Sequence, residues 1–156
     1  MPSINYNERS WAIDVISHIN IYLSTRDKII KYAGGENTIR NNSRSLFPDI
    51  LLFADISQGE ILQGWELKMP DTSIADEEFI NNATIKANTL SLDSFILWNV
   101  KSAVLYVRSN EDSDKFEIFH NWDEIEIDHR ENVQENDSLW KGLLENIIET
   151  LCSFFE

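Results

Sequence analysis

The sequence predicts an α/β fold in which a mixed central sheet of four to five strands is flanked by helices. Three observations support this fold class: an amphipathic first segment, two apolar stretches separated by a short turn, and two further apolar stretches after a second helical segment. Helical and strand-like segments in this order favour layers that pack around one core. A chain of 156 residues is long enough to bury such a core as a single domain.

The first predicted helix covers residues 8–24. Its large apolar side chains recur at spacings of three and four, which places them on one face of a helix. They are Trp11, Val15, Ile16, Ile19 and Leu23. Residues 34–45 are rich in Gly, Asn and Ser, which favour turns. We therefore expect an amphipathic helix followed by a loop.

A hairpin is expected from residues 46–54 and 60–68, which are apolar stretches on either side of the turn-like sequence ISQG. Pro48 cannot donate a hydrogen bond to a neighbouring strand, so it should lie at a strand start or a bulge. If the two stretches pair, each polar residue within them is brought to a defined place on the sheet.

The middle of the chain predicts a second helix and further strands. Residues 71–90 begin with the cap-like sequence DTS and continue with a helical pattern. Two apolar stretches, 94–100 and 102–109, should form strands joined by a very short connection, and 115–122 could add another.

The chain divides into three expected segments: a core domain at 1–122, an acidic linker at 123–138, and an amphipathic helix at 139–156. The apolar stripe of the last segment is wider than one face needs. Its members are Leu139, Leu143, Leu144, Ile147, Ile148, Leu151, Phe154 and Phe155. We expect part of this stripe to dock a following domain, another subunit or a second copy of the chain. The alternative is an ordinary closing helix that packs wholly within the domain.

Net charge does not exclude a nucleic-acid partner, although the total is −14. Residues 111–156 hold 3 Lys or Arg and 14 Asp or Glu, a net charge of −11, whereas residues 1–110 hold 10 and 13, a net charge of −3. Arg40 and Arg44 lie in the predicted loop just before the hairpin, whose polar residues are described below. Both are therefore candidate DNA-binding residues, through contacts to phosphates.

Location and redox state follow from what the sequence lacks. No apolar run approaches the roughly 18 residues of a membrane span, and the polar start of the chain does not resemble a signal peptide. Cys152 is the single cysteine, so an internal disulfide is impossible. We expect a cytoplasmic protein with no membrane partner.

Three polar residues interrupt the predicted hairpin: Asp49, Glu66 and Lys68. Glu66 and Lys68 are two apart and share one face of a strand, and the opposite strand can bring Asp49 to the same end of the sheet. A lone Glu-x-Lys usually forms a solvated surface pair, but polar residues in strands that read as buried need a reason. Two carboxylates can hold Mg²⁺ while leaving positions for water and phosphate, and an ammonium can orient that water. Phosphodiester hydrolysis is the chemistry that this set suits.

The arrangement of FPDILLF, a gap and WELK, followed by a helix and two strands, resembles the PD-(D/E)XK nuclease superfamily over residues 8–108. Pro48 and Asp49 match the PD, and Glu66, Leu67 and Lys68 match the E-x-K. More narrowly, it resembles the amino-terminal nuclease segments of restriction enzymes that are fused to an N6-adenine DNA methyltransferase.

This resemblance implies a restriction-endonuclease-like fold and a Mg²⁺-dependent DNA endonuclease, the cleavage part of a restriction-modification enzyme. It implies that Asp49, Glu66 and the backbone carbonyl of Leu67 hold Mg²⁺, with Mn²⁺ as a possible substitute, and that Lys68 activates water. It further implies double-stranded DNA as a partner, together with a fused or associated methyltransferase or recognition domain. An acidic residue of the first helix, Glu8 or Asp14, could contribute.

One subgroup pattern is not matched. Some members of the superfamily carry Gln-x-x-x-Tyr on the helix after the E-x-K, whereas the corresponding helix here has Asn82, Lys86 and Asn88. Two alternatives to an active nuclease stay open: an inactive nuclease-like fold, and an acidic protein-interaction module that binds through the tail and the last helix.

Two further groups of residues have a simpler explanation than function. The spacing of His120, Asp123 and His129 does not justify a metal site, so exposed or locally bonded histidines are expected. Trp65, Trp98 and Tyr106 could stack on bases. Each lies in an apolar strand, which favours a place in the core.

Overall fold

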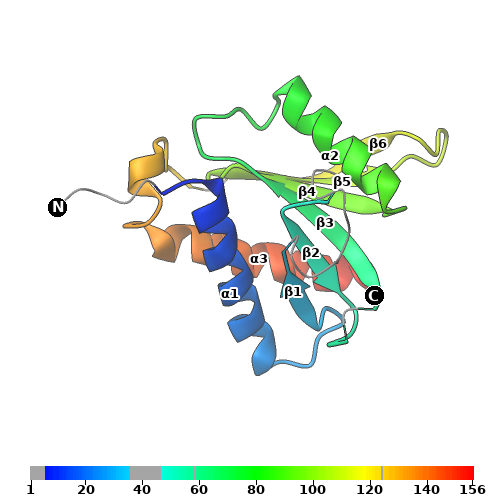
Figure 1. Ribbon diagram of the computed structural model, residues 1–156, viewed down its shortest axis with the longest axis horizontal. Helices are drawn as coiled ribbons and strands as arrows, with labels where there is room; N and C mark the ends of the chain where they lie inside the picture. Colours follow the sequence, from blue (N-terminus) through cyan, green and yellow to red (C-terminus); the bar gives the residue numbers. More distant parts are fainter. Residues whose placement is uncertain (1–5, 36–46, 58, 124) are drawn as a thin grey trace.

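A six-stranded mixed sheet, with helices on both of its faces, forms the part of the chain that the structure describes (Figure 1). The structure is a computed structural model and describes residues 6–35, 47–57, 59–123 and 125–156. The elements are, in order, α1 (Glu8–Ser24), β1 (Tyr32–Gly34), β2 (Ile50–Phe53), β3 (Ile61–Leu67), α2 (Glu77–Thr89), β4 (Ser94–Trp98), β5 (Ser102–Arg108), β6 (Phe116–Asp123), the 3₁₀ turn η3 (Arg130–Asn132) and α3 (Asp137–Phe155).

The strands lie side by side in chain order, from β1 to β6. All neighbouring pairs are antiparallel except β3 and β4, which are parallel and joined through α2. The α/β class and the predicted hairpin are confirmed, with Ile50 of β2 opposite Trp65 of β3. The predicted strand number of four to five is wrong. The described residues contain six strands because Tyr32–Gly34, too short to show an alternating pattern, pairs along the edge of β2.

Helix α1 has the predicted bounds and the predicted buried face. Its amino end is capped by Asn7, whose side chain accepts a hydrogen bond of 3.0 Å from the Ser10 N–H. Helix α2 begins later than predicted, at Glu77 rather than at residue 71. The Asp76 carboxylate caps it by accepting the Phe79 N–H at 3.0 Å, whereas the DTS sequence lies in the turn before it.

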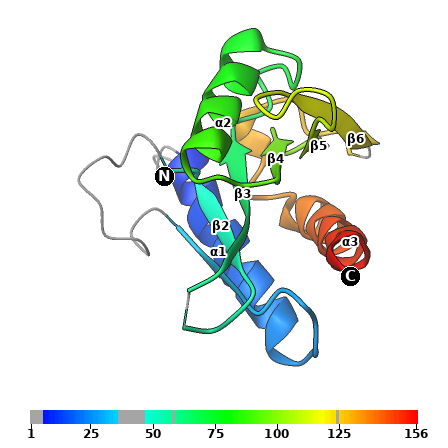
Figure 2. The same cartoon turned by 90° about the vertical axis from the view of Figure 1, so that its right-hand side faces the viewer.

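The sheet has two unlike faces, which Figures 1 and 2 show between the helices. The face covered by α1 and α3, here called the Trp face, buries four tryptophans in one large cluster: Trp11, Trp65, Trp98 and Trp140. The face covered by α2, here called the α2 face, buries a smaller cluster: Phe79, Ala83, Ala87, Leu92, Phe95, Leu97, Val104 and Tyr106. Trp65, Trp98 and Tyr106 are therefore core residues, as expected.

Residues 125–156, which include α3, pack on the Trp face. Ile127 and Val133, from the predicted acidic linker, are buried there. Helix α3 buries most of its apolar stripe, but Leu139 is 44% exposed, and Phe154 and Phe155 are only partly buried. Docking of this helix against a further surface stays a prediction. Among the described residues, no helix combines the length and the apolar character that crossing a bilayer requires.

Candidate functional site

The candidate site lies where β3 ends and β2 begins, on the α2 face. Glu66 lies within β3, Lys68 follows its last residue, and Asp49 directly precedes β2. The antiparallel register brings Asp49 beside β3, where its carboxylate Oδ2 accepts the Leu67 N–H at 2.8 Å. The structure thus brings together the three residues that the sequence pattern singled out.

Close packing of the hairpin fixes the position of Asp49. At Gly64 of β3 an added Cβ atom would lie 2.5 Å from Cγ of Pro48, so only a glycine lets the proline ring rest on the strand. Pro48 in turn precedes Asp49 and sets its backbone direction. The sequence predicted Pro48 at a strand start or a bulge, but no role for Gly64 was predicted.

These side chains line one small pocket of about 150 Å³. Its lining residues are Glu8, Asp49, Glu66, Leu67, Lys68, Phe79, Asn82 and Lys86. Glu8 and Asp49 also line a second, wider hollow of about 610 Å³ along α1. The candidate site therefore borders a larger depression on the surface of the molecule.

Glu66 is the most buried charged group of the site, with 6% of its surface exposed. Burial, reinforced by the negative charge of Asp49, raises the pKa of Glu66 to about 7, although the ammonium groups of Lys86 and Lys68 act in the opposite direction. The two carboxylates are thus close enough to repel each other. A cation placed between them would relieve that repulsion.

Lys86 is the site residue that sequence reasoning did not assign. Its ammonium forms an ion pair with Glu66 and contacts both carboxylate oxygens, with Nζ 3.2 Å from Oε2. On α2, the spacing of Phe79, Asn82 and Lys86 places them on adjoining positions of one helix side, and all three line the pocket. The sequence signal was their shared spacing, but the spacing alone does not tell which strand that side of the helix meets.

The donor set fits Mg²⁺ better than a metal that needs many protein ligands. No group of three or more His, Cys, Asp or Glu side chains is placed to hold a metal ion among the described residues. Asp49 and Glu66 offer carboxylate oxygens, and the Leu67 N–H points toward Asp49. Because the N–H and C=O of a strand residue point to the same neighbour, the Leu67 carbonyl faces that side as well. Mg²⁺ typically keeps several waters and needs only one or two carboxylates.

The remaining predicted residues are not all at the site. Of the two acidic candidates on α1, Glu8 lines the pocket, whereas Asp14 accepts the Tyr6 hydroxyl at 2.5 Å and lines another pocket, between α1 and α3. Arg40 and Arg44 lie outside the described residues. Their role in DNA binding stays a prediction.

The histidines take no part in the site. His18 Nε2 lies 2.9 Å from a carboxylate oxygen of Glu145, while His120 and His129 are exposed. This agrees with the expectation of exposed or locally bonded histidines.

Comparison with models of protein families, with curated proteins and with solved structures found no match to this chain.

Proposed function

We propose that this chain is a Mg²⁺-dependent DNA endonuclease domain of the PD-(D/E)XK type, with a restriction-endonuclease-like fold. The observation that carries the proposal is the convergence of Asp49, Glu66 and Lys68 on one pocket at the strand ends. The element order from α1 through the hairpin and α2 to β5 supports it, since this order is the one that the family resemblance implies. The substrate is double-stranded DNA, and the larger protein is a restriction-modification enzyme.

Each residue of the site has a defined task in this proposal. Asp49, Glu66 and the Leu67 carbonyl would hold Mg²⁺, which when bound lowers the pKa of water and neutralises phosphate charge; Mn²⁺ can substitute. Lys68 lines the pocket, where its ammonium can orient the attacking water or a phosphate oxygen. Burial of Glu66 removes water from its carboxylate, which strengthens its interaction with any cation.

An inactive nuclease-like fold is the second candidate, and one observation favours it. Lys86 already neutralises Glu66, so the site is partly compensated without a metal. A chain that has lost catalysis could keep such a pair as a structural contact. The same experiment separates the two candidates.

Nicking of supercoiled plasmid tests the proposal, with Mg²⁺, Mn²⁺ or Ca²⁺ supplied in turn. Wild-type protein should nick with Mg²⁺ or Mn²⁺, and Asp49→Asn, Glu66→Gln and Lys68→Met should each lower the rate by at least roughly 100-fold, because each removes a charge from the reacting centre. Asn at position 49 retains an oxygen that can accept the Leu67 N–H, so the hairpin contact is preserved.

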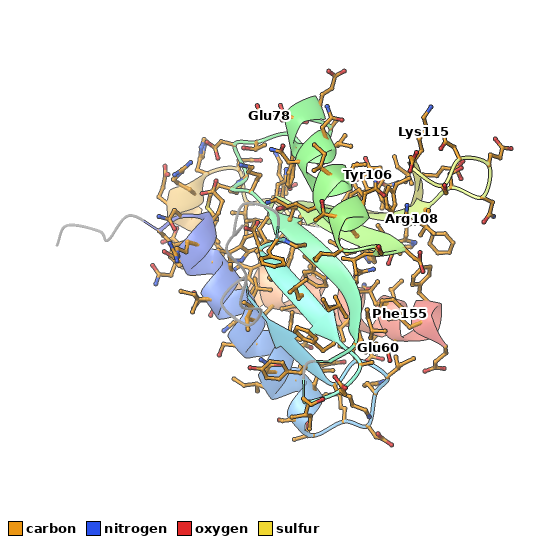
Figure 3. The ribbon with its side chains drawn as sticks, turned by 45° about the vertical axis from the view of Figure 1, so that its right-hand side comes forward. Glu60, Glu78, Tyr106, Arg108, Lys115 and Phe155 are labelled. Carbon is orange, nitrogen blue, oxygen red and sulfur yellow. The ribbon has the colours of Figure 1, made fainter. Side chains whose placement is uncertain are left out.

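Matched controls are Glu78→Gln and Lys115→Met. Figure 3 shows Glu78 at the outer end of α2 and Lys115 in the turn before β6, and both side chains are exposed. These variants should keep wild-type activity. Nicking that survives in Asp49→Asn at the wild-type rate would remove the assignment, and a folded wild type that never nicks would favour the inactive fold.

A further inference from the structure

Resting on the proposed function, we infer that Lys86 is an internal counter-ion that competes with the divalent cation for Glu66 and passes to a substrate phosphate when the cation binds. The starting point is the ion pair between α2 and β3, whose two side chains are 20% and 8% exposed for Lys86 and Glu66. Such a pair is shielded from solvent, unlike the mobile ion pairs of a protein surface.

The charges that line the pocket require a counter-ion when no metal is bound. With every side chain counted in its ionised form, Glu8, Asp49 and Glu66 bring three negative charges, whereas Lys68 and Lys86 bring two positive charges, a net charge of −1. Without Lys86 the net charge would be −2 around a buried carboxylate. An uncompensated buried charge is costly, so Lys86 stabilises the metal-free site.

A bound divalent cation reverses this balance, because the net charge of the same lining becomes +1. Glu66 then has two positive partners for one carboxylate, and the ammonium and the cation repel each other. The cation can be held by Asp49 as well, whereas Lys86 contacts Glu66 alone among the carboxylates of the pocket for which an ion pair is described. Lys86 is therefore the partner that should leave.

Once released from Glu66, the ammonium stays within reach of the substrate. Helix α2 is anchored by Phe79, Ala83 and Ala87, which are buried against the sheet. The long, flexible side chain of Lys86 can turn while its backbone stays in place, and an ammonium is a common point-charge partner for phosphate. A phosphodiester bound at the metal supplies the negative charge that Lys86 has lost.

This exchange makes metal binding and DNA binding depend on each other. DNA that draws Lys86 away from Glu66 raises the affinity for the metal, and by thermodynamic linkage the metal raises the affinity for DNA by the same factor. Removing the Lys86 charge should therefore help the metal when DNA is absent and harm DNA binding when the metal is present.

Calorimetry with Mn²⁺ alone, without DNA, gives the first measurement. Lys86→Met should bind Mn²⁺ at least roughly tenfold more tightly than wild type, because the competing ammonium is gone. Lys86→Arg should stay close to wild type, and the exposed Lys115→Met is the charge-matched control that should change nothing.

Binding of a duplex oligonucleotide in Ca²⁺, which supports binding without relying on cleavage, gives the second measurement. Lys86→Met should weaken DNA binding and reduce the salt slope by about one. Tighter Mn²⁺ binding together with weaker DNA binding supports the inference. The same holds if Lys86→Met binds Mn²⁺ where the wild type shows no measurable binding, provided that the variant also binds DNA more weakly.

The possible failures can be told apart. If wild type binds Mn²⁺ and nicks plasmid while Lys86→Met shows unchanged or weaker Mn²⁺ binding, the inference falls and the proposed function stands. Unchanged DNA binding in the variant also overturns the transfer to phosphate. If neither protein binds Mn²⁺, both the inference and the proposed metal site fall.

Discussion

The two faces of the sheet divide stability from chemistry. On the Trp face, four tryptophans interlock edge to face, with centroid distances of 4.6 to 6.4 Å among Trp11, Trp65, Trp98 and Trp140. On the α2 face, a smaller apolar cluster ends at a pocket that holds carboxylates and ammonium groups. Burial of the large apolar cluster stabilises the fold, and this offsets the repulsion between the carboxylates of Asp49 and Glu66 in the neighbouring pocket. Substitutions on the Trp face should therefore lower stability and leave metal binding intact, whereas substitutions on the α2 face should change metal binding and the pH dependence of stability.

The largest expected effect is on the Trp face. Trp98 is fully buried between the other tryptophans, and its Nε1–H donates to the Val100 carbonyl at 3.0 Å. Trp98→Ala should lower the free energy of unfolding by about 3–5 kcal/mol, measured in urea, through lost burial and a cavity. Trp11→Phe is the contrast: the Trp11 Nε1–H has no partner among the described residues, so its loss should cost much less than that.

If Trp98→Ala abolished Mn²⁺ binding in protein that remains folded at low temperature, the Trp face would not serve stability alone. If the melting temperature fell while the affinity for Mn²⁺ stayed the same, the separate roles of the two faces would be supported.

The next effect is a pH dependence of stability that arises on the α2 face. The pKa of Glu66 is raised from 4.5 to about 7 in the folded state, so the folded protein binds the proton more tightly than the unfolded chain. Its contribution to stability is fully present below pH 4.5 and is lost as pH rises through about 7. The loss is at most roughly 3 kcal/mol.

Urea unfolding of wild type and Glu66→Gln at pH 5 and pH 8, without divalent ions, isolates this contribution. The stability difference between the two proteins should move in favour of Glu66→Gln as pH rises. Mg²⁺ at pH 8 should restore the wild type and leave the variant unchanged. A difference that does not vary with pH would contradict the raised pKa of Glu66, which burial and, secondly, the negative charge of Asp49 cause.

The sequence predicted those structural features that arise from a pattern within one short segment of the chain. The spacing in α1 and the two apolar stretches of the hairpin are local patterns, so α1, β2 and β3 were predicted, and the two-residue period of a strand placed Glu66 and Lys68 together. The start of α2 was missed because DTS and Asp76 carry the same capping chemistry. Asp76 has two acidic residues after it, in the first turn, which suits the helix dipole.

Other features depend on packing between distant segments. The ion pair of Lys86 with Glu66 needs α2 to present one particular side to β3, which no local pattern encodes. The fit of Pro48 against Gly64 likewise depends on the strand register. The unforeseen β1 forms because the edge of β2 offers unpaired backbone groups, and three residues are enough to use them.

The smallest expected effect concerns the end of the Trp face near the carboxyl end of α3, where aromatic side chains stay partly exposed to solvent. The rings of Phe119 on β6 and Phe154 on α3 lie 5.2 Å apart. At the end of the helix, the ring of Phe155 lies 5.3 Å from that of Phe154 (Figure 3). Phe119 is 60% exposed, so its ring contributes little to the core. Phe119→Ser should change the free energy of unfolding by less than about 1 kcal/mol but weaken any self-association through this end.

Sedimentation at high concentration measures the second effect, with Ile85→Ser on the exposed side of α2 as control. A wild type that stays monomeric at every concentration would show that this helix simply closes the domain, and that the wide apolar stripe is used within the chain.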